Sequence, residues 1–289
     1  MATPAAAGVE EGPLAIIAGG GAIPMAVADA VERRGRRVVM FPVRGWADPA
    51  VERYRHHWIA PVQAGRFQRL ARAEGCRDIV FIGTALRPPF SALRLDWLTL
   101  RLLPRVVRAY RGGDDHLLSS IARALEDYGF RIVGAHEVAP EILMPEGPIG
   151  GLRPSMRDQA DIARALELLE ATGPFDMGQA AVVADNHVLA LEATEGTDAM
   201  LRRIAELRGQ GWIAAPAGTG VLVKAPKPQQ DKRFDLPAIG PRTVEEAARA
   251  GLAGIAVVAG GSIIAEPAAV AASADRAKVF VVGVKAGER

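Results

Sequence analysis

The feature that most restricts the fold of this chain is a short apolar run that leads through three glycines into a helix pattern. The run is Leu14–Ala18, the glycines are Gly19, Gly20 and Gly21, and the helix pattern covers 23–34. Glycine gives the backbone unusual freedom, and a helix N-terminus offers unpaired N–H groups to an anion. Strand, glycine turn and helix in this order open a βαβ nucleotide-binding unit. We therefore predict an α/β protein with a Rossmann-like N-terminal domain and a parallel sheet.

The glycine turn departs from the dinucleotide fingerprint. Its spacing is GGG-x-x-P, and the second apolar run, 37–43, ends in Arg44-Gly45 with no acid to hold a ribose. An NAD-dependent dehydrogenase is therefore disfavoured. A third strand is predicted over 78–84, and its carboxyl end lies on the same sheet edge as the glycine turn. The substrate-binding residues expected at this edge are Gly20, Gly21, Ala22, Gly83, Thr84 and, just beyond it, Arg87.

Proline and glycine mark a division near the middle of the chain. Residues 139–156 contain Pro140, Pro145, Pro148 and Pro154 among several glycines, which is typical of a domain linker. The predicted organisation is a flexible tail over 1–13, the Rossmann-like domain over 14–138, the linker over 139–156 and a distinct mixed α/β domain over 157–289. In that second domain we predict hairpins at 179–193, across Asp185-Asn186-His187, and at 253–265, across Gly260-Gly261.

Composition excludes several classes of protein. With 289 residues, 49% of them hydrophobic and 24% charged, the chain is globular. A net charge of +2 argues against bulk nucleic-acid binding, so no nucleic-acid partner is expected. The single cysteine, Cys76, excludes a disulfide framework and is expected in the core. The first thirteen residues lack signal-peptide character, and no apolar run approaches the roughly 20 residues of a membrane span. We expect a cytoplasmic protein.

One segment leaves a membrane-surface contact open. Residues 93–111 alternate leucines and Trp97 with arginines. This pattern fits a basic amphipathic helix that touches lipid, and it fits equally a packed helix whose arginines reach solvent. The packed helix is favoured, because such helices in globular proteins usually pack against the core.

The strongest chemical candidate is the stretch KAPKPQQDKRFDLPAIG at 224–240. Prolines stiffen it, and it places Lys224 and Lys227 in the same loop as a carboxylate, Asp235. Cations neutralise a phosphorylated substrate, and a carboxylate binds a metal or activates water. A solvated charged loop is the plainer interpretation.

Other candidates stand where helices and strands begin or end. Asp114 and Asp115 follow two glycines and are expected to cap a helix, and Thr197 or Asp198 caps another that runs to Arg208. A strand over 130–138 carries His136 near its end, where a histidine is more often packed than catalytic. Substrate contacts are predicted for Asp114, Asp115, His136, Glu195, Thr197 and Asp198.

Eight motifs, in one order along nearly the whole chain, together resemble a known family. They are IIAGGGAIP (16–24), FPVRGWADP (41–49), FIGTALRPPFSAL (81–93), RGGDDHLL (111–118), GAHEV (134–138), GQAAVV (178–183), LALEATEGTDAMLRR (189–203) and KAPKPQQDKRFDLPAIG (224–240). The family is the LpxI type of UDP-2,3-diacylglucosamine pyrophosphatase of lipid A biosynthesis.

The resemblance implies a cytoplasmic hydrolase of Gram-negative bacteria. It would split UDP-2,3-diacylglucosamine into UMP and 2,3-diacylglucosamine 1-phosphate with Mg²⁺. The family's essential aspartate lies in a DLP motif, which here is Asp235. The lipid would lie between the two domains. Spacing alone does not decide whether Asp235 binds the metal or takes the proton of the attacking water.

Two other functions remain open. A sensor that binds a nucleotide sugar without turnover has the same kind of cleft, and a sugar-nucleotide transferase has the same kind of phosphate site. The sensor would release no product, and the transferase would release no UMP without an acceptor. A homodimer and a transient contact with a membrane surface are further expectations.

Overall fold

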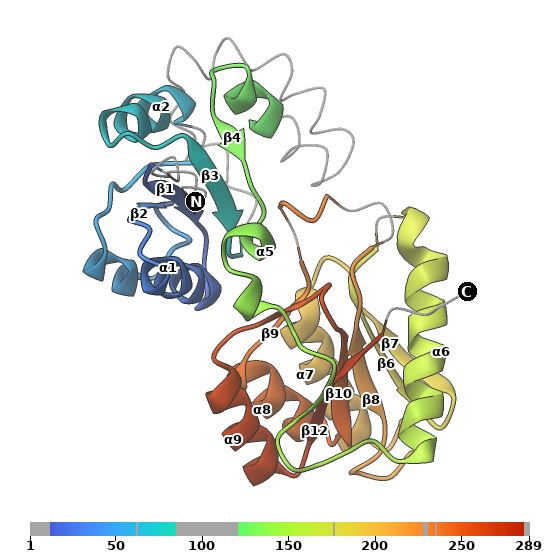
Figure 1. Ribbon diagram of the computed structural model, residues 1–289. Helices are drawn as coiled ribbons and strands as arrows, with labels where there is room; N and C mark the ends of the chain where they lie inside the picture. The colour runs from blue at the N-terminus through green and yellow to red at the C-terminus, as the bar shows by residue number, and fades with distance from the viewer. Residues whose placement is uncertain are drawn as a thin grey trace, which may run out of the picture. The chain divides into compact units, whose positions relative to one another are not determined.

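The structure is a computed structural model, and it describes residues 12–61, 63–84, 121–175, 177–227, 231–234 and 236–285. The chain divides into two compact units (Figure 1). Unit 1 comprises Met1–Pro140 together with Asp231–Phe234. Unit 2 comprises Glu141–Gln230 and Asp235–Arg289. A short piece of the C-terminal half therefore belongs to unit 1.

Unit 1 is built on a parallel sheet, as predicted. Its strands run in the order β2-β1-β3-β4. They are β1 (Leu14–Ala18), β2 (Val38–Pro42), β3 (Asp78–Ile82) and β4 (Arg131–Ile132). The helices α1 (Ile23–Arg33) and α2 (Ala64–Ala73) and the 3-10 helix η1 (Pro49–Arg53) connect them. The strand order reverses between β1 and β3, and open sheets of this kind bind ligands outside the carboxyl ends of the strands at such a reversal.

The core of unit 1 is aromatic. The rings of Phe41 and Phe67 meet edge to face at 4.8 Å, and Phe130 lies 5.9 Å from Phe67. Phe67 and Ala71 lie on the buried side of the amphipathic helix α2. Cys76 is buried in the same cluster, and burial raises the pKa of its thiol to about 11, so it is a core residue as expected.

The amino ends of two strands are joined by ion pairs. Asp78 lies opposite Arg131 in the β3–β4 register and accepts two hydrogen bonds from it, each 2.8 Å long. Arg36 donates a third at 2.5 Å. The Arg131 hydrogen bonds and the Arg36 guanidinium hold the pKa of the Asp78 carboxyl below its usual value.

Unit 2 is built on a mixed sheet with the strand order β5-β12-β10-β8-β6-β7. Its strands are β5 (Gly147–Ile149), β6 (Ala180–Ala184), β7 (His187–Leu191), β8 (Val221–Lys224), β10 (Gly254–Val258) and β12 (Phe280–Val284). Strands β8, β10 and β12 are parallel, whereas β5, β6 and β7 pair in antiparallel fashion. The predicted mixed α/β fold is confirmed. A separate pair, β9 (Ala238–Ile239) and β11 (Ile263–Ile264), is parallel.

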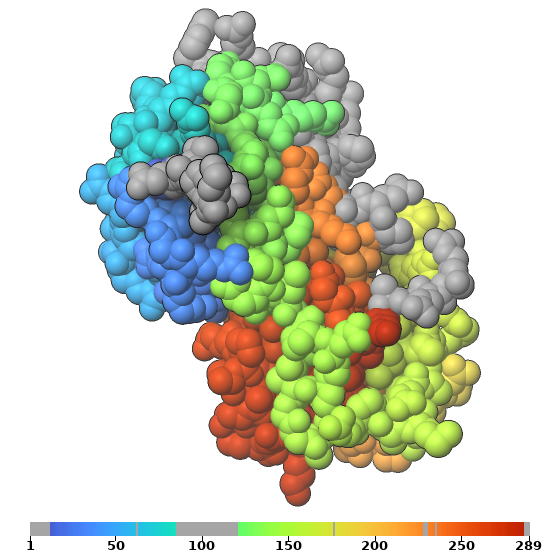
Figure 2. Space-filling view, viewed as in Figure 1, coloured from blue at the N-terminus to red at the C-terminus, as the bar shows by residue number. Residues whose placement is uncertain are grey.

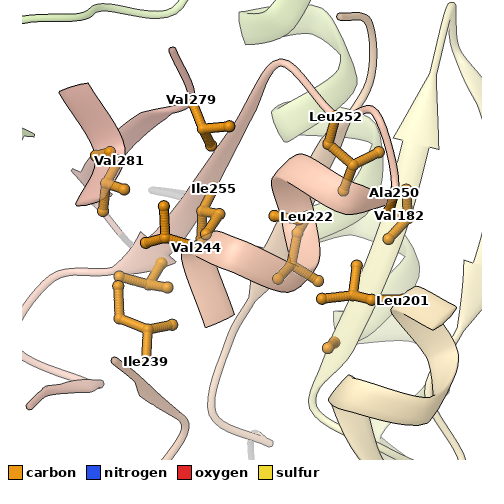
Figure 3. Packing of buried hydrophobic residues seen from close by; sticks show 14 of the residues in the cluster. Val182, Leu201, Leu222, Ile239, Val244, Ala250, Leu252, Ile255, Val279 and Val281 are labelled. Atoms are coloured by element: carbon orange, nitrogen blue, oxygen red, sulfur yellow. The ribbon is translucent and has the colours of Figure 1, made fainter. Parts of the chain in front are cut away.

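Helices cover both faces of this sheet (Figure 1). Alternate residues of one strand pack on opposite sides, so Val221 and Val223 face α6 (Met156–Thr172) while Leu222 faces the other helices. Those helices are α7 (Gly196–Gly209), α8 (Pro241–Arg249) and α9 (Pro267–Ala277). Figure 3 shows part of the hydrophobic cluster between the sheet and these three helices, with Leu201 beside Leu222. Burial on both faces explains why these strands are continuously apolar.

The outer side of α6 faces solvent, and its yellow-green surface is open to view in Figure 2. At its N-terminus, Ser155 and Asp158 form a capping box. Buried Asp161 accepts hydrogen bonds from the backbone N–H groups of Asp185 (3.1 Å) and Asn186 (2.7 Å), both of which have positive φ. The antiparallel pairing of β6 with β7 confirms the predicted hairpin. Asn186 has a structural role in its turn through the hydrogen bond to Asp161.

Three segments differ from the sequence predictions. The predicted strand 130–138 is strand only at β4, and the short helix α5 (Ala135–Val138) follows, because Glu137 accepts a 2.7 Å hydrogen bond from the Gly134 N–H and caps it. The predicted linker 139–156 contains the 3-10 helix η3 (Pro140–Ile142) and the edge strand β5. The predicted hairpin over 253–265 is wrong, since β10 pairs with β8 and β12 and β11 pairs with β9.

Within the part of the chain that the structure describes, no helix is long and apolar enough to cross a membrane. The segment 93–111 lies outside the described residues, so its two interpretations stay predictions.

Candidate active site

The turns after β1 and β3 pair with each other at the carboxyl edge of the unit 1 sheet. Gly20 donates its N–H to the Thr84 carbonyl at 2.8 Å, and Thr84 donates back to the Gly20 carbonyl at 2.9 Å. Gly19 donates to the carbonyl of Ile82 at 2.8 Å. The predicted neighbours Gly20, Gly21, Gly83 and Thr84 therefore share this edge, and Arg87 lies outside the described residues.

Packing explains two of these glycines. A Cβ atom on Gly19 would lie 2.5 Å from the Thr84 carbonyl oxygen. Gly83 has φ +100°, and its Cβ would lie 2.8 Å from the Gly20 oxygen. Gly21 differs, because it has φ +89° but open space where a Cβ would point. Ala22 is the N-cap of α1, and no side chain caps this helix. The edge thus presents backbone, which suits an anion at a helix N-terminus.

The segment Asp231–Phe234 belongs to unit 1 through side-chain contacts. Arg233 forms ion pairs with Glu126 (3.0 Å) and Asp231 (2.8 Å). The Phe234 ring meets Phe81 of β3 edge to face at 5.9 Å. The hydrogen bonds from Arg233, with a smaller contribution from the charge of His136, lower the pKa of Asp231. Four residues of the predicted Lys224–Gly240 loop therefore belong to unit 1, and one of them contacts β3 close to the edge described above.

Asp235 directly follows Phe234 in sequence but lies outside the described residues. Phe234 belongs to unit 1, and the residue after Asp235, Leu236, belongs to unit 2. The predicted catalytic aspartate thus stands where the chain passes from one unit to the other. Its predicted roles remain untested, as do those of Asp114 and Asp115, which also lie outside the described residues.

His136 lies in α5 rather than at the end of a strand. Its Nδ1 atom is buried and has no hydrogen-bond partner among the described residues. The ring folds over Gly134, where an added Cβ would lie 2.3 Å from the His136 Cε1 atom. Since its charge acts on Asp231, His136 belongs to the surroundings of the Asp231–Phe234 segment. Its predicted contact with substrate stays a prediction.

In unit 2, Lys224 is buried at the carboxyl end of β8. Only 8% of the residue is exposed. Its ammonium donates hydrogen bonds to the Thr197 hydroxyl at 3.0 Å and to the Ala238 carbonyl at 3.1 Å. Lys227, two residues beyond Ala225, is half-buried. The two predicted lysines therefore differ in environment, and the Lys224 ammonium bonds to residues of α7 and β9.

The hydrogen bonds continue from Thr197 to Glu192, a residue that sequence reasoning missed. The Thr197 hydroxyl donates to Glu192 Oε1 at 2.6 Å, and the Gln179 N–H donates to Glu192 Oε2 at 2.7 Å. Glu192 is 9% exposed. Because β7 runs antiparallel to β6, and β6 antiparallel to β8, its carboxyl end reaches the same sheet edge as Lys224. An acid directly after an apolar strand was the available signal.

The neighbouring acids are paired with arginines. Glu195 forms a 3.0 Å ion pair with Arg203, and Asp198 forms a 3.0 Å ion pair with Arg242. The expected cap by Thr197 or Asp198 is wrong: α7 begins at Gly196 with Glu195 as N-cap and no side-chain capping bond. Thr197 instead bonds Glu192 within the buried network.

Among the residues that the structure describes, no group of three or more His, Cys, Asp or Glu side chains gathers as metal ligands do. The metal ligand expected from the sequence, Asp235, is outside that set. Carboxylate oxygens are the donors that Mg²⁺ prefers, so the chemistry of Asp235 fits this ion.

Comparison with known proteins covers both units. A family model described as LpxI N-terminal domain matches residues 13–142, and one described as LpxI C-terminal domain matches residues 145–282. The UDP-2,3-diacylglucosamine pyrophosphatase LpxI of Caulobacter vibrioides is 45% identical over 276 residues, which cover 96% of this chain and 99% of that protein. The two models span every candidate residue named above.

Proposed function

The chain belongs to the LpxI family, and from this premise we propose that it hydrolyses the pyrophosphate bond of UDP-2,3-diacylglucosamine. The products are UMP and 2,3-diacylglucosamine 1-phosphate, and the reaction serves lipid A biosynthesis. The observation that carries this proposal is the match to a pyrophosphatase of that name along nearly the full length of both chains. We further propose a cytoplasmic location, and transient contact with a membrane surface because the proposed substrate is amphipathic.

The chemistry of the substrate sets what the residues must do. A pyrophosphate resists water because its anionic oxygens repel the nucleophile, so catalysis neutralises those oxygens and positions the water. The backbone edge at Gly20–Gly21 and Gly83–Thr84, with the N-terminus of α1, suits one phosphate group. Taken by itself, unit 2 offers Lys227, which follows the carboxyl end of β8, and the buried Lys224 as positive charges that suit anionic oxygens.

We assign Asp235 to the reacting centre, as ligand of Mg²⁺ or as the base that takes the proton of the attacking water. The ion, when bound, supplies positive charge to the pyrophosphate oxygens. Support comes from the neighbours of Asp235: Phe234 is held against Phe81 of β3, and the segment is further held by Arg233 and Glu126. The predicted contacts of Asp114, Asp115, Glu195 and Asp198 with substrate are secondary to this assignment.

The test is UMP release by the purified full-length protein from UDP-2,3-diacylglucosamine with Mg²⁺. We expect turnover by the wild-type protein, and we expect Asp235→Ala to reduce kcat by roughly 10²- to 10⁴-fold. A chelator should abolish release, and added Mg²⁺ should restore it. Glu167→Ala, at an exposed acid of α6, is the control and should keep wild-type activity.

Two results would contradict the hydrolase proposal, and a third would contradict only the role of Asp235. Saturable binding by folded protein without UMP would favour the nucleotide-sugar sensor. UMP release only after addition of an acceptor would favour the transferase. Full activity of Asp235→Ala would remove that residue from the reacting centre and leave the hydrolase assignment standing.

A further inference from the structure

The chain leaves unit 2 after Gln230, beyond β8, and returns to it before β9 begins. Between these strands it contributes Asp231–Phe234 to unit 1 and carries Asp235. Lys224 is the last residue of β8, and Ala238 is the first residue of β9. The Lys224 ammonium donates directly to the Ala238 carbonyl at 3.1 Å. One side chain therefore joins the end of β8 to the start of β9.

Other contacts hold the two arms of this segment at the same sheet edge. On the outgoing arm, Pro226 packs on Gly261, where an added Cβ would lie 3.2 Å from the proline ring. On the returning arm, the Pro237 carbonyl accepts a 2.8 Å hydrogen bond from the Ile263 N–H. The first contact fixes the outgoing arm to the turn after β10, and the second fixes the returning arm to β11. The Lys224 hydrogen bond links β8 to β9 directly.

The hydrogen bonds behind Lys224 have a fixed direction. An ammonium only donates and an ionised carboxylate only accepts, so the Thr197 hydroxyl must accept from Lys224 and donate to Glu192. Both measured distances agree with this, at 3.0 Å and 2.6 Å. A buried charge without a partner is costly, and here the hydroxyl couples a buried cation to a buried anion. Loss of the hydroxyl breaks both hydrogen bonds at once.

We propose that Glu192 and Thr197 are positioning residues, which act through Lys224 to hold together the two ends of the segment that carries Asp235. Neither residue needs to touch the substrate in this role. The inference rests on the proposed hydrolase activity for its kinetic consequences, but its structural consequence can be measured without any substrate.

The kinetic test replaces the hydroxyl. Because a displacement of about 1 Å at a reacting group can cost 10²-fold, we expect Thr197→Val to lower kcat by roughly 10- to 100-fold. KM should stay within about twofold, since binding contacts are retained. Thr197→Ser keeps the hydroxyl and should restore kcat. Thr219→Val is the matched control, because its hydroxyl donates to the Pro216 carbonyl in an exposed turn. A raised KM with unchanged kcat, or no effect of either kind, would overturn the proposal.

The structural test is hydrogen exchange of backbone amides in the full-length protein. Glu192→Gln removes the anion at constant shape, and Glu167→Gln, on the exposed side of α6, is its control. Exchange at Ala225, Ala238 and Ile239 should rise by about tenfold or more in Glu192→Gln and Thr197→Val, with β10 unchanged. Unchanged exchange at these amides in Glu192→Gln would refute the positioning role, even if Thr197→Val failed to fold. If exchange rises in both variants but the wild-type protein releases no UMP, the hydrolase proposal is rejected and the positioning role is retained.

Discussion

The two sheet edges that carry the candidate residues are built from different materials. In unit 1, the edge at Gly20 and Thr84 consists of backbone packed on backbone, and its limits are steric. In unit 2, the edge at Glu192, Thr197 and Lys224 consists of buried side chains joined by hydrogen bonds, and its limits are electrostatic. Two similar sheet edges are therefore sensitive to different substitutions. The unit 1 edge is destabilised by a larger side chain, and the unit 2 edge is destabilised by the loss of a buried charge.

The largest effect is expected from removing charge in unit 2. Lys224→Met leaves Glu192 buried without its cation, and breaking a buried pair in this way costs roughly 3–5 kcal/mol. Urea unfolding, monitored by hydrogen exchange in each unit, should show the loss in unit 2. Lys278→Met, at an exposed lysine after α9, should change stability by less than about 0.5 kcal/mol. Equal effects of the two substitutions would mean that the unit 2 edge is not held by charge.

A smaller effect is expected from adding a side chain to a glycine in unit 1. Comparing two glycines separates the cost of backbone strain from the cost of a steric clash. Gly83→Ala introduces both a left-handed alanine and a clash with the Gly20 carbonyl, so we expect a loss of about 2–4 kcal/mol. Gly21→Ala introduces the same backbone strain into open space and should cost about 1–2 kcal/mol. The difference in unfolding free energy measures the steric part alone. If the two variants were equally stable, close packing would not explain Gly83.

The smallest effect is expected on the pH dependence of the stability of unit 1, where the ion pairs of Asp78 add an electrostatic contribution to the steric one at the glycine edge. The pKa of Asp78 is lowered in the folded state by Arg131 and Arg36, so its contribution to stability is present above the unfolded value of about 3.9. That contribution is lost as the pH falls through the lower, folded pKa. Asp78→Asn should flatten the stability of unit 1 below about pH 4 in acid titrations. An Asp78→Asn variant whose stability falls with acid as steeply as that of the wild type would show that Asp78 does not carry this dependence.

Local sequence signals located much of the fold and one of the two edges. The unit 1 edge was predictable because glycines and strand ends mark it within short stretches, at 19–22 and 83–84. The unit 2 network was not, because Gln179, Glu192, Thr197 and Lys224 come from separate elements that meet only through strand order. Lys224 was predicted as a site residue because it is a cation in the same loop as Asp235. Its burial was not predicted, because the residues that enclose it are distant in sequence.

The misassigned segments have local causes as well. Gly260-Gly261 looks like a hairpin turn, yet β10 pairs in parallel with β8 and β12 in the middle of the sheet, where all five of its residues are buried. Residues 130–138 look like one strand, but the capping bond from Gly134 to Glu137 starts a helix after Val133. In both places a tertiary or capping contact outweighs the pattern of apolar residues.

The membership of Asp231–Phe234 in unit 1 has a consequence for inheritance. A recombination event that exchanged only the first 140 residues between two relatives would bring a new Phe81 and Glu126 to face an old Phe234 and Arg233. Exchange of the first half alone is therefore expected to disturb these contacts, although each half encodes a sheet of its own. We expect substitutions within each contacting pair to be energetically coupled.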